Sequence, residues 1–125
     1  MLNEDNKIRC LVVDDSLLSV KIATNAVSSI SNHIDSCISG KDAIQMVKMH
    51  HYDVILMDIM MPEMDGVETF RRLKEIECFN APIVAVTSDN EKGAKEKYLE
   101  IGFNAYLDKP YRDDVLIDII LKILA

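Results

Sequence analysis

Short apolar runs alternate with longer segments of helical period along the chain. The longer segments repeat apolar residues at three- and four-residue spacing, which is the pattern of one buried helix face. Strands that alternate with helices in this way pair in parallel, because each helix carries the chain back across the sheet. The pattern therefore predicts an α/β fold of five strand and helix pairs, with strands at residues 8–13, 33–39, 53–57, 82–86 and 104–107.

One strand and one helix are more apolar than the others. The third strand, residues 53–57, is almost wholly apolar and should lie at the sheet centre, where helices cover both faces. The last helix, about residues 112–124, has its polar residues mainly in one stripe formed by Asp114, Asp118 and Lys122. Its apolar arc is wider than one core-facing stripe requires. Two interpretations are open: wide burial against the sheet, or a docking or dimer surface.

Length, composition and charge fit one acidic globular domain. The chain has 125 residues, of which 49% are hydrophobic, so we expect a single domain over residues 1–125 with its core at about 8–124. A net charge of −7 argues against direct nucleic-acid binding, and no apolar run is long enough for membrane insertion. Three widely spaced cysteines indicate neither a zinc site nor a disulfide framework, which favours a cytoplasmic location.

Polar residues with distinctive chemistry follow four of the five expected strands. Asp14 and Asp15 follow the first strand, Asp58 the third, Thr87 the fourth and Lys109 the fifth. Each residue alone has an ordinary explanation, such as capping a helix. In an open parallel sheet, however, ligands bind in the crevice outside the carboxyl ends of the strands. We therefore expect these side chains to meet in that crevice.

Three carboxylates in one crevice require a cation. Each pair repels by about 4 kcal/mol at about 4 Å separation and an effective dielectric of about 20. Oxygen donors without histidine or cysteine favour a hard divalent ion such as Mg²⁺. Lys109 adds a second positive charge and Thr87 a hydroxyl donor, a set that suits phosphoryl transfer onto a carboxylate. Asp58 is the expected nucleophile.

The order and spacing of these motifs resemble the signature of the response regulator receiver family over about residues 8–124. The resemblance implies a flavodoxin-like, doubly wound five-stranded parallel sheet in the order 2-1-3-4-5, with five helices. It also implies that a histidine kinase or histidine phosphotransfer protein phosphorylates Asp58. Such a chain is a signalling domain that catalyses its own phosphorylation and dephosphorylation, not an enzyme. The motifs are Asp14-Asp15, the segment from Asp58 to Gly66, the turn at Thr87, and Lys109-Pro110.

The resemblance assigns metal ligands to the acidic residues. Asp15, Asp58 and the backbone carbonyl of Met60 would ligate Mg²⁺ directly. Asp14 would hold the ion through a water molecule. All of these groups lie in or directly after the first and third strands expected from the sequence.

The same resemblance gives roles to residues near the fourth and fifth strands. Thr87 and Lys109 would contact the phosphoryl oxygens, and the Lys109-Pro110 bond would be cis. Tyr106 matches the aromatic residue that turns inward when the threonine hydroxyl moves toward the phosphoryl group. That motion would alter the surface of the fourth helix, fifth strand and fifth helix, through which the chain could form a homodimer or bind an effector.

Two other classes of protein share parts of this pattern. An aspartyl-nucleophile phosphatase also uses acidic groups, Mg²⁺ and a lysine, but it has a second aspartate two residues after the nucleophile, where this chain has Met60. A flavin-binding module would hold a phosphate with backbone donors in the loop after the first strand, and Asp14 and Asp15 would repel that phosphate. Both classes fit less well than a receiver domain.

Two residues beside the site vary within the family and influence how water attacks the acyl phosphate. They are Met60 and Asp89, which lie two positions after Asp58 and Thr87. We expect the bulky Met60 side chain to slow self-hydrolysis. The sequence leaves open whether the chain is a stand-alone regulator or a domain of a hybrid kinase or a longer regulator.

Overall fold

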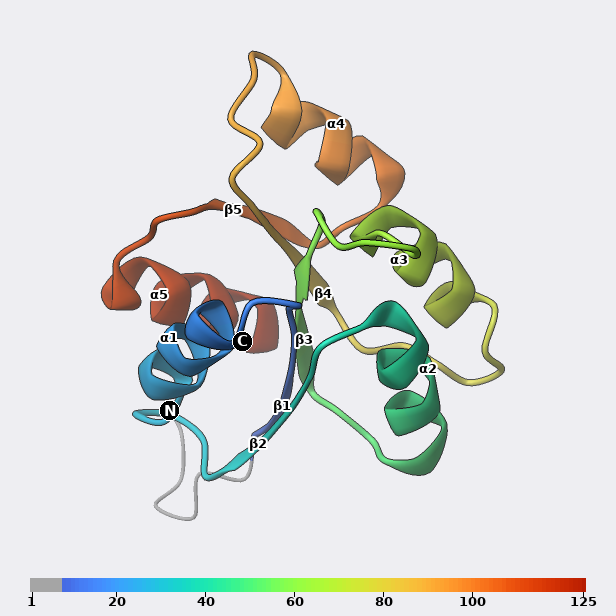
Figure 1. The fold of residues 1–125 in the computed structure, drawn as a ribbon. Coiled ribbons are helices and arrows are strands. Elements are labelled where there is room, and N and C mark those ends of the chain that lie inside the picture. The colour runs from blue at the N-terminus through green and yellow to red at the C-terminus, as the bar shows by residue number, and fades with distance from the viewer. Residues whose placement is uncertain (1–7) are drawn as a thin grey trace.

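A five-stranded parallel sheet with helices on both faces forms the fold in the computed structural model, which describes residues 8–125. The strands are β1 (Arg9–Val13), β2 (His33–Cys37), β3 (Val54–Asp58), β4 (Ile83–Thr87) and β5 (Ala105–Asp108). The helices are α1 (Leu17–Val27), α2 (Gly40–Met49), α3 (Gly66–Lys74), α4 (Ala94–Ile101) and α5 (Asp113–Leu124). The strand order is β2-β1-β3-β4-β5, with α1 and α5 on one face and α2, α3 and α4 on the other (Figure 1). The predicted fold class, strand order and helix number are confirmed.

Two central strands end one residue later than the apolar pattern predicts. The pattern predicted β3 at 53–57 and β4 at 82–86, yet both strands begin and end one position further on. The reason is that backbone pairing continues past the apolar run: Asp58 and Val86 are register partners, and the Ile59 N–H donates to the Val86 carbonyl at 3.1 Å. This pairing fixes Asp58 and Thr87 at the last positions of adjacent strands.

Polar side chains cap three of the helices. Ser16, Ser39 and Asp65 accept hydrogen bonds from backbone N–H groups three residues later, at 3.2, 3.1 and 2.9 Å. These bonds satisfy N–H groups that have no partner within the helix. The turns that follow β1 and β2 are therefore short, which keeps Asp14 and its neighbours at the carboxyl edge of the sheet.

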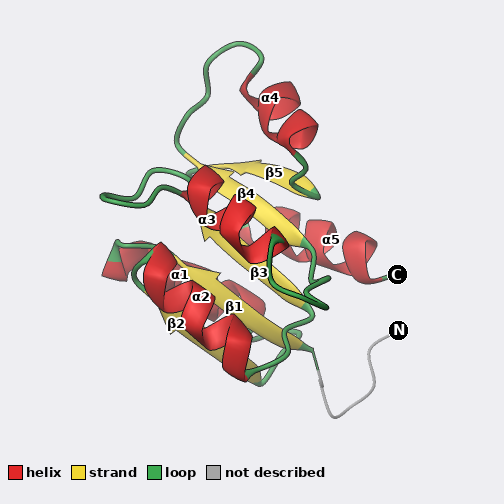
Figure 2. Ribbon diagram, turned by 90° about the vertical axis from the view of Figure 1, so that its right-hand side faces the viewer, coloured by secondary structure: helices red, strands yellow, loops and turns green. Residues whose placement is uncertain are grey.

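The strand β3 carries the centre of the core. Ile55 and Met57 join the apolar cluster under α2, α3 and α4, while Val54 and Leu56 join the cluster under α1 and α5. The alternation follows from the two-residue period of a strand. All four side chains are at most 2% exposed, which confirms the predicted central position, and Figure 2 shows β3 between β1 and β4.

The helix α5 buries more than one stripe of its surface. Ile120 is fully buried, and Ile117 and Leu124 are half-buried against the cluster beneath α1 and α5. Val115 and Leu121 remain 41% and 38% exposed. Wide burial thus accounts for most of the apolar arc, and the docking interpretation applies only to the exposed remainder.

The predicted domain limits are only partly covered by the structure. Residues 1–7 of the predicted domain lie outside the described residues. Within residues 8–125, none of the helices combines the length and the apolar character needed to cross a bilayer.

Candidate functional site

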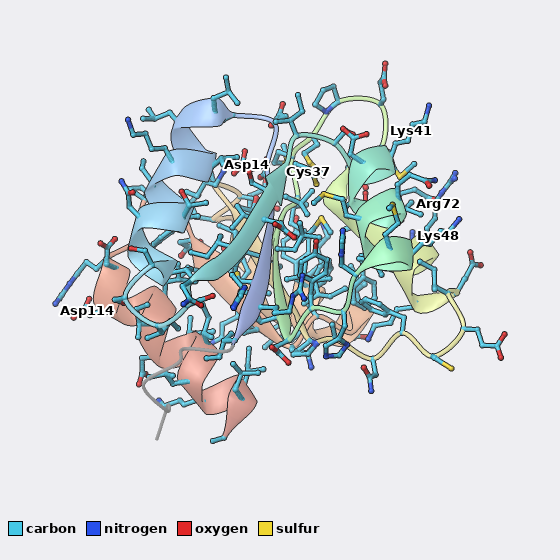
Figure 3. All side chains as sticks on the ribbon, turned by 90° about the horizontal axis from the view of Figure 1, so that it is seen from below. Asp14, Cys37, Lys41, Lys48, Arg72 and Asp114 are labelled. Carbon is cyan, nitrogen blue, oxygen red and sulfur yellow. The ribbon has the colours of Figure 1, made fainter. Side chains whose placement is uncertain are left out.

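Three carboxylates gather at the carboxyl edge of the sheet. Asp14 and Asp15 follow β1, and Asp58 ends β3, so adjacent parallel strands deliver them to one place. One oxygen from each carboxylate lies within 4.8 Å of the others. The Asp14 N–H donates to the Cys37 carbonyl at 3.1 Å, and Figure 3 shows the two residues side by side where β1 and β2 end. The structure therefore brings the predicted acidic residues together.

The three carboxylates differ in their access to water. Asp14 and Asp58 are each only 5% exposed, whereas Asp15 is exposed. One Asp14 oxygen accepts a hydrogen bond from the Ser16 N–H at 2.9 Å. The crevice thus has two desolvated carboxylates at its base and one at its mouth.

Lys109 reaches the acidic cluster from the segment after β5. Its Nζ lies 2.7 Å from an Asp14 oxygen and 3.6 Å from Asp58 Oδ1. The Lys109 backbone N–H donates to the Thr87 carbonyl at 2.9 Å, which anchors the segment to the end of β4. The Lys109-Pro110 bond is cis, as the resemblance implied. One ammonium group therefore forms ion pairs with two buried carboxylates, and it lies closer to Asp14.

Burial and crowding act on the Asp58 carboxyl group. Burial is the main cause that raises the pKa of Asp58 to about 7, and the charge of Asp14 adds to the increase. Two groups lower the pKa of Asp58 and so oppose this increase. They are the charged Lys109 and the Met60 N–H, which donates to Asp58 Oδ1 at 3.3 Å. Protonation, a cation or a positively charged side chain relieves this repulsion.

The loop after β3 passes close behind Asp58. The Gly66 N–H donates to the Ile59 carbonyl at 2.9 Å and closes the loop on the strand end. A Cβ at Gly66 would lie 2.4 Å from the Asp58 carbonyl oxygen, so only glycine fits. The Met60 side chain, in contrast, is 62% exposed at the site. The metal-ligand role of the Met60 carbonyl stays a prediction.

Thr87 and Tyr106 lie on the other side of Asp58: Thr87 ends β4, and Tyr106 is the second residue of β5. Thr87 is fully buried, and its hydroxyl oxygen accepts a hydrogen bond from the Asp89 N–H at 3.0 Å. Tyr106 is half-buried, and its hydroxyl donates to the Asp89 carbonyl at 2.6 Å and also contacts Asp108. Both predicted residues therefore meet at Asp89. Their roles in transfer and switching stay predictions.

The sequence analysis missed three residues that contact or border this site. Ser19 Oγ lies 3.4 Å from Lys109 Nζ, and Tyr111 lines the crevice beside Asp14. The Tyr98 hydroxyl donates to Asp89 at 2.9 Å. Ser19 lies in the first turn of α1, directly after the acidic pair, and this closeness in sequence was the available signal.

The acidic cluster suits a divalent cation. Its donors are carboxylate oxygens from Asp14, Asp15 and Asp58, a set that hard ions prefer and softer metals do not. Three carboxylates carry more negative charge than the single ammonium group of Lys109 neutralises. The exposed Asp15 gives a hydrated ion access from solvent.

Comparison with known proteins gives close agreement over nearly the whole chain. Residues 10–121 match the family model described as the response regulator receiver domain. The chain is 33% identical over 113 residues to the signal transduction histidine-protein kinase BarA of Escherichia coli (strain K12). The matched region covers 90% of this chain and 12% of that protein. The chain is 35% identical over 127 residues to the hybrid signal transduction histidine kinase B of Dictyostelium discoideum, covering 91% of this chain and 6% of that protein. The chain thus spans only 12% or less of the length of these two relatives.

A solved structure agrees with the same assignment. The CheX-CheY-BeF3-Mg+2 complex from Borrelia burgdorferi matches with a TM-score of 0.87 and 26% identity. The match covers 99% of this chain and 96% of that chain. The arrangement of sheet and helices is therefore shared from end to end.

Proposed function

This chain belongs to the response regulator receiver family, the phosphoacceptor domains of two-component phosphorelays, and we propose that Asp58 is its phosphoacceptor. The observation that carries the proposal is the environment of the Asp58 carboxylate. It is 5% exposed, lies beside two other carboxylates and has an ammonium group 3.6 Å away. A carboxylate held in this way attacks a phosphoryl group readily once its surroundings neutralise the accumulating charge.

The metal in this proposal is Mg²⁺, held by Asp15 and Asp58 with Asp14 in support and the Met60 carbonyl as a further ligand. The all-oxygen donor set favours Mg²⁺ over softer metals. The similar complex from Borrelia burgdorferi includes BeF3 and Mg²⁺, as its name states. When bound, the ion would supply positive charge to the carboxylates and to the phosphoryl oxygens.

Asp58, Lys109 and Thr87 have different roles in the proposed phosphoryl transfer. An Asp58 oxygen attacks the phosphorus of a phosphohistidine, the phosphorus–nitrogen bond breaks, and the leaving imidazole takes up a proton. Lys109 leaves Asp14 and contacts a phosphoryl oxygen instead, and the Thr87 hydroxyl donates a hydrogen bond to a second phosphoryl oxygen. The domain thus catalyses its own phosphorylation, with positioning and charge neutralisation as the main contributions.

The donor in this proposal is a histidine kinase or a histidine phosphotransfer protein. The relatives include a histidine-protein kinase and a hybrid histidine kinase, according to their names. A protein donor must cover the mouth of the crevice, and three large apolar side chains are exposed around it. These are Leu17, Leu18 and Met60, which are 74%, 70% and 62% exposed.

Further parts of the proposal concern the output and location of the domain. Val115 and Tyr106 line a groove between β5 and α5, and we assign this face, with α4, to a homodimer or effector contact. All three cysteines of the chain are free, which supports a reducing, cytoplasmic setting. The acidic charge gives no basis for direct nucleic-acid binding.

The experiment that tests the proposal is incubation with acetyl phosphate and Mg²⁺, followed by intact mass measurement. Wild type should gain one phosphate, and Asp58→Asn should gain none. Asp118→Asn is the matched control, because it removes an exposed carboxylate on α5 that pairs with Lys122, away from Asp58 in the sequence and on a different element. Equal uptake by wild type and Asp58→Asn would show that the acceptor is another residue.

A further inference from the structure

Asp89 is held by four hydrogen bonds in the loop between β4 and α4. Its backbone N–H donates to Thr87 Oγ1 at 3.0 Å, and its carbonyl accepts from the Tyr106 hydroxyl at 2.6 Å. Its carboxylate accepts from the Glu91 N–H at 3.2 Å and from the Tyr98 hydroxyl at 2.9 Å. A half-exposed loop residue with every polar group engaged has little freedom to move independently of its partners.

Of the two partners of the Asp89 carboxylate, Tyr98 is the more firmly placed, since Glu91 is exposed. Tyr98 lies on α4 with 2% of its surface exposed, packs edge-on against Phe103, and stacks on Tyr106 with ring centroids 6.0 Å apart. Burial keeps the hydroxyl protonated by raising the pKa of Tyr98 to about 12. The same hydrogen bond holds the pKa of Asp89 below its ordinary value. The bond therefore joins a fixed donor to an ionised acceptor, which is the stronger type of hydrogen bond.

The direction of the Asp89 carboxylate matters for the phosphoryl site. Asp89 lines a surface groove with Met60, Lys97 and Tyr98. Its carboxylate accepts hydrogen bonds from Tyr98 on α4 and from Glu91 in the turn before that helix. Tyr98 therefore keeps this carboxylate on the α4 side of the loop.

We propose that Tyr98 is a positioning residue for the phosphoryl-transfer site: through Asp89, its hydroxyl holds the Thr87 hydroxyl in the arrangement found without a phosphoryl group. The inference rests on the proposed function of Asp58. The resemblance implies that the Thr87 hydroxyl moves toward the phosphoryl group, and the loop bonded to it through the Asp89 N–H must then follow or break that bond. The Tyr98–Asp89 bond opposes that shift because it ties the loop to a buried ring on α4.

This contact also relates Tyr98 to the proposed switch at Tyr106. Both hydroxyl groups bond to Asp89, and the two rings are stacked within 10° of parallel. An inward turn of Tyr106 would break its bond to Asp89 and its stacking on Tyr98. The two tyrosines therefore stabilise the same state of the loop, and the loss of either hydroxyl should favour the other state.

The test is the initial rate of phosphorylation by acetyl phosphate with Mg²⁺ for wild type and Tyr98→Phe. Asp89 is half-exposed, and water weakens a hydrogen bond to a charged group, so losing this bond in one of the two states should change their ratio by roughly two- to tenfold. We therefore expect Tyr98→Phe to be phosphorylated about two to ten times faster. Tyr52→Phe is the matched control, because Tyr52 is also 2% exposed and also donates to a carboxylate, Asp35, at 2.6 Å. Its rate should equal that of wild type.

A double-mutant cycle with Asp89→Ala separates positioning from a general effect on packing. Asp89→Ala alone should also accelerate phosphorylation, and adding Tyr98→Phe to it should change the rate no further. The inference would be overturned if Tyr98→Phe were phosphorylated at the wild-type rate. It would also be overturned if Tyr98→Phe accelerated phosphorylation equally in wild type and in Asp89→Ala. If Tyr98→Phe does not fold, an unchanged rate for Asp89→Ala alone would overturn it. Failure of the proposed function would look different, since wild type itself would then show no Asp58-dependent uptake.

Discussion

Replacement of Asp58 by asparagine should stabilise the metal-free domain. The substitution keeps the size of the side chain and an oxygen that can accept the Met60 N–H, but it removes one of two buried carboxylates. Most single substitutions at buried sites destabilise a protein, by about 1 kcal/mol on average. An increase in stability at a buried polar position would therefore be informative about the repulsion in this site.

The magnitude follows from the pKa of Asp58, which rises from 3.8 to about 7 on folding. At about 1.4 kcal/mol for each pKa unit, this difference corresponds to about 4 kcal/mol of destabilisation when the group is ionised in both states. Lys109 loses one partner in the variant, and the mouth of the crevice is open to water at Asp15. We therefore expect a net gain of about 1 to 3 kcal/mol at pH 8.

The sign of the pH dependence is fixed by the same two pKa values. Folding raises the pKa, so the folded state binds more protons than the unfolded state between pH 3.8 and about 7. The stability of wild type should fall as the pH rises through this range, relative to Asp58→Asn. The difference between the two proteins should be full above about pH 7 and should vanish near pH 4.

The assay is urea unfolding at several pH values, in EDTA and in Mg²⁺, for wild type, Asp58→Asn and the control Asp118→Asn. Mg²⁺ should stabilise wild type more than Asp58→Asn, because Asp58 is one of the proposed ligands in the folded state. Lower stability of Asp58→Asn than of wild type at pH 8 in EDTA would refute the reasoning. A difference between them that does not change with pH would also refute it.

Three further substitutions test other parts of the site. Met60→Asn should shorten the half-life of the phosphoaspartate, because a smaller polar side chain beside Asp58 admits and orients water. The loss of the phosphate over time is measured by intact mass, and a shorter half-life for wild type than for Met60→Asn would contradict this expectation. Gly66→Ala should destabilise the domain by about 2 kcal/mol or more in urea unfolding, since its Cβ would meet the Asp58 carbonyl oxygen at 2.4 Å; wild-type stability would show that the loop can move. Lys109→Met should lower the stability in EDTA by about 1 to 3 kcal/mol, because Asp14 and Asp58 lose their cation. Mg²⁺ should restore part of the lost stability. If Mg²⁺ did not change the stability of Lys109→Met, this would contradict the expectation that Lys109 and Mg²⁺ both neutralise the carboxylates.

The fold and the grouping of the site residues could be predicted because they depend on the backbone. Apolar periodicity placed all five strands, and parallel pairing then required Asp14 and Asp58 to lie at the same edge. The shift of β3 and β4 by one residue was missed because backbone pairing does not stop where the apolar run stops. The burial of Ile117 was left open, because a wide apolar arc describes both a buried helix and a docking surface.

Side-chain contacts between distant elements could not be predicted from the sequence. Lys109 was expected at the crevice, but its closer approach to Asp14 than to Asp58 depends on the path of the chain after β5. The Tyr98–Asp89 bond was not predicted either, since nothing in the spacing of two residues on a loop and a helix specifies a hydrogen bond. Such contacts depend on rotamers and loop geometry, which the apolar pattern does not encode.

In the proposed function, the unequal exposure of the three carboxylates allows one cluster to hold a cation and also to supply the nucleophile. Asp15 is exposed, so a strongly hydrated ion can approach without losing all of its water at once. Asp58 is 5% exposed, so its attacking oxygen has little water to displace before it meets phosphorus. If all three were buried, the uncompensated charge would destabilise the fold further, and if all were exposed, Asp58 would lose its desolvated environment. Asp14 and Asp15 are adjacent residues after the end of β1, so a difference of one position separates a buried carboxylate from an exposed one.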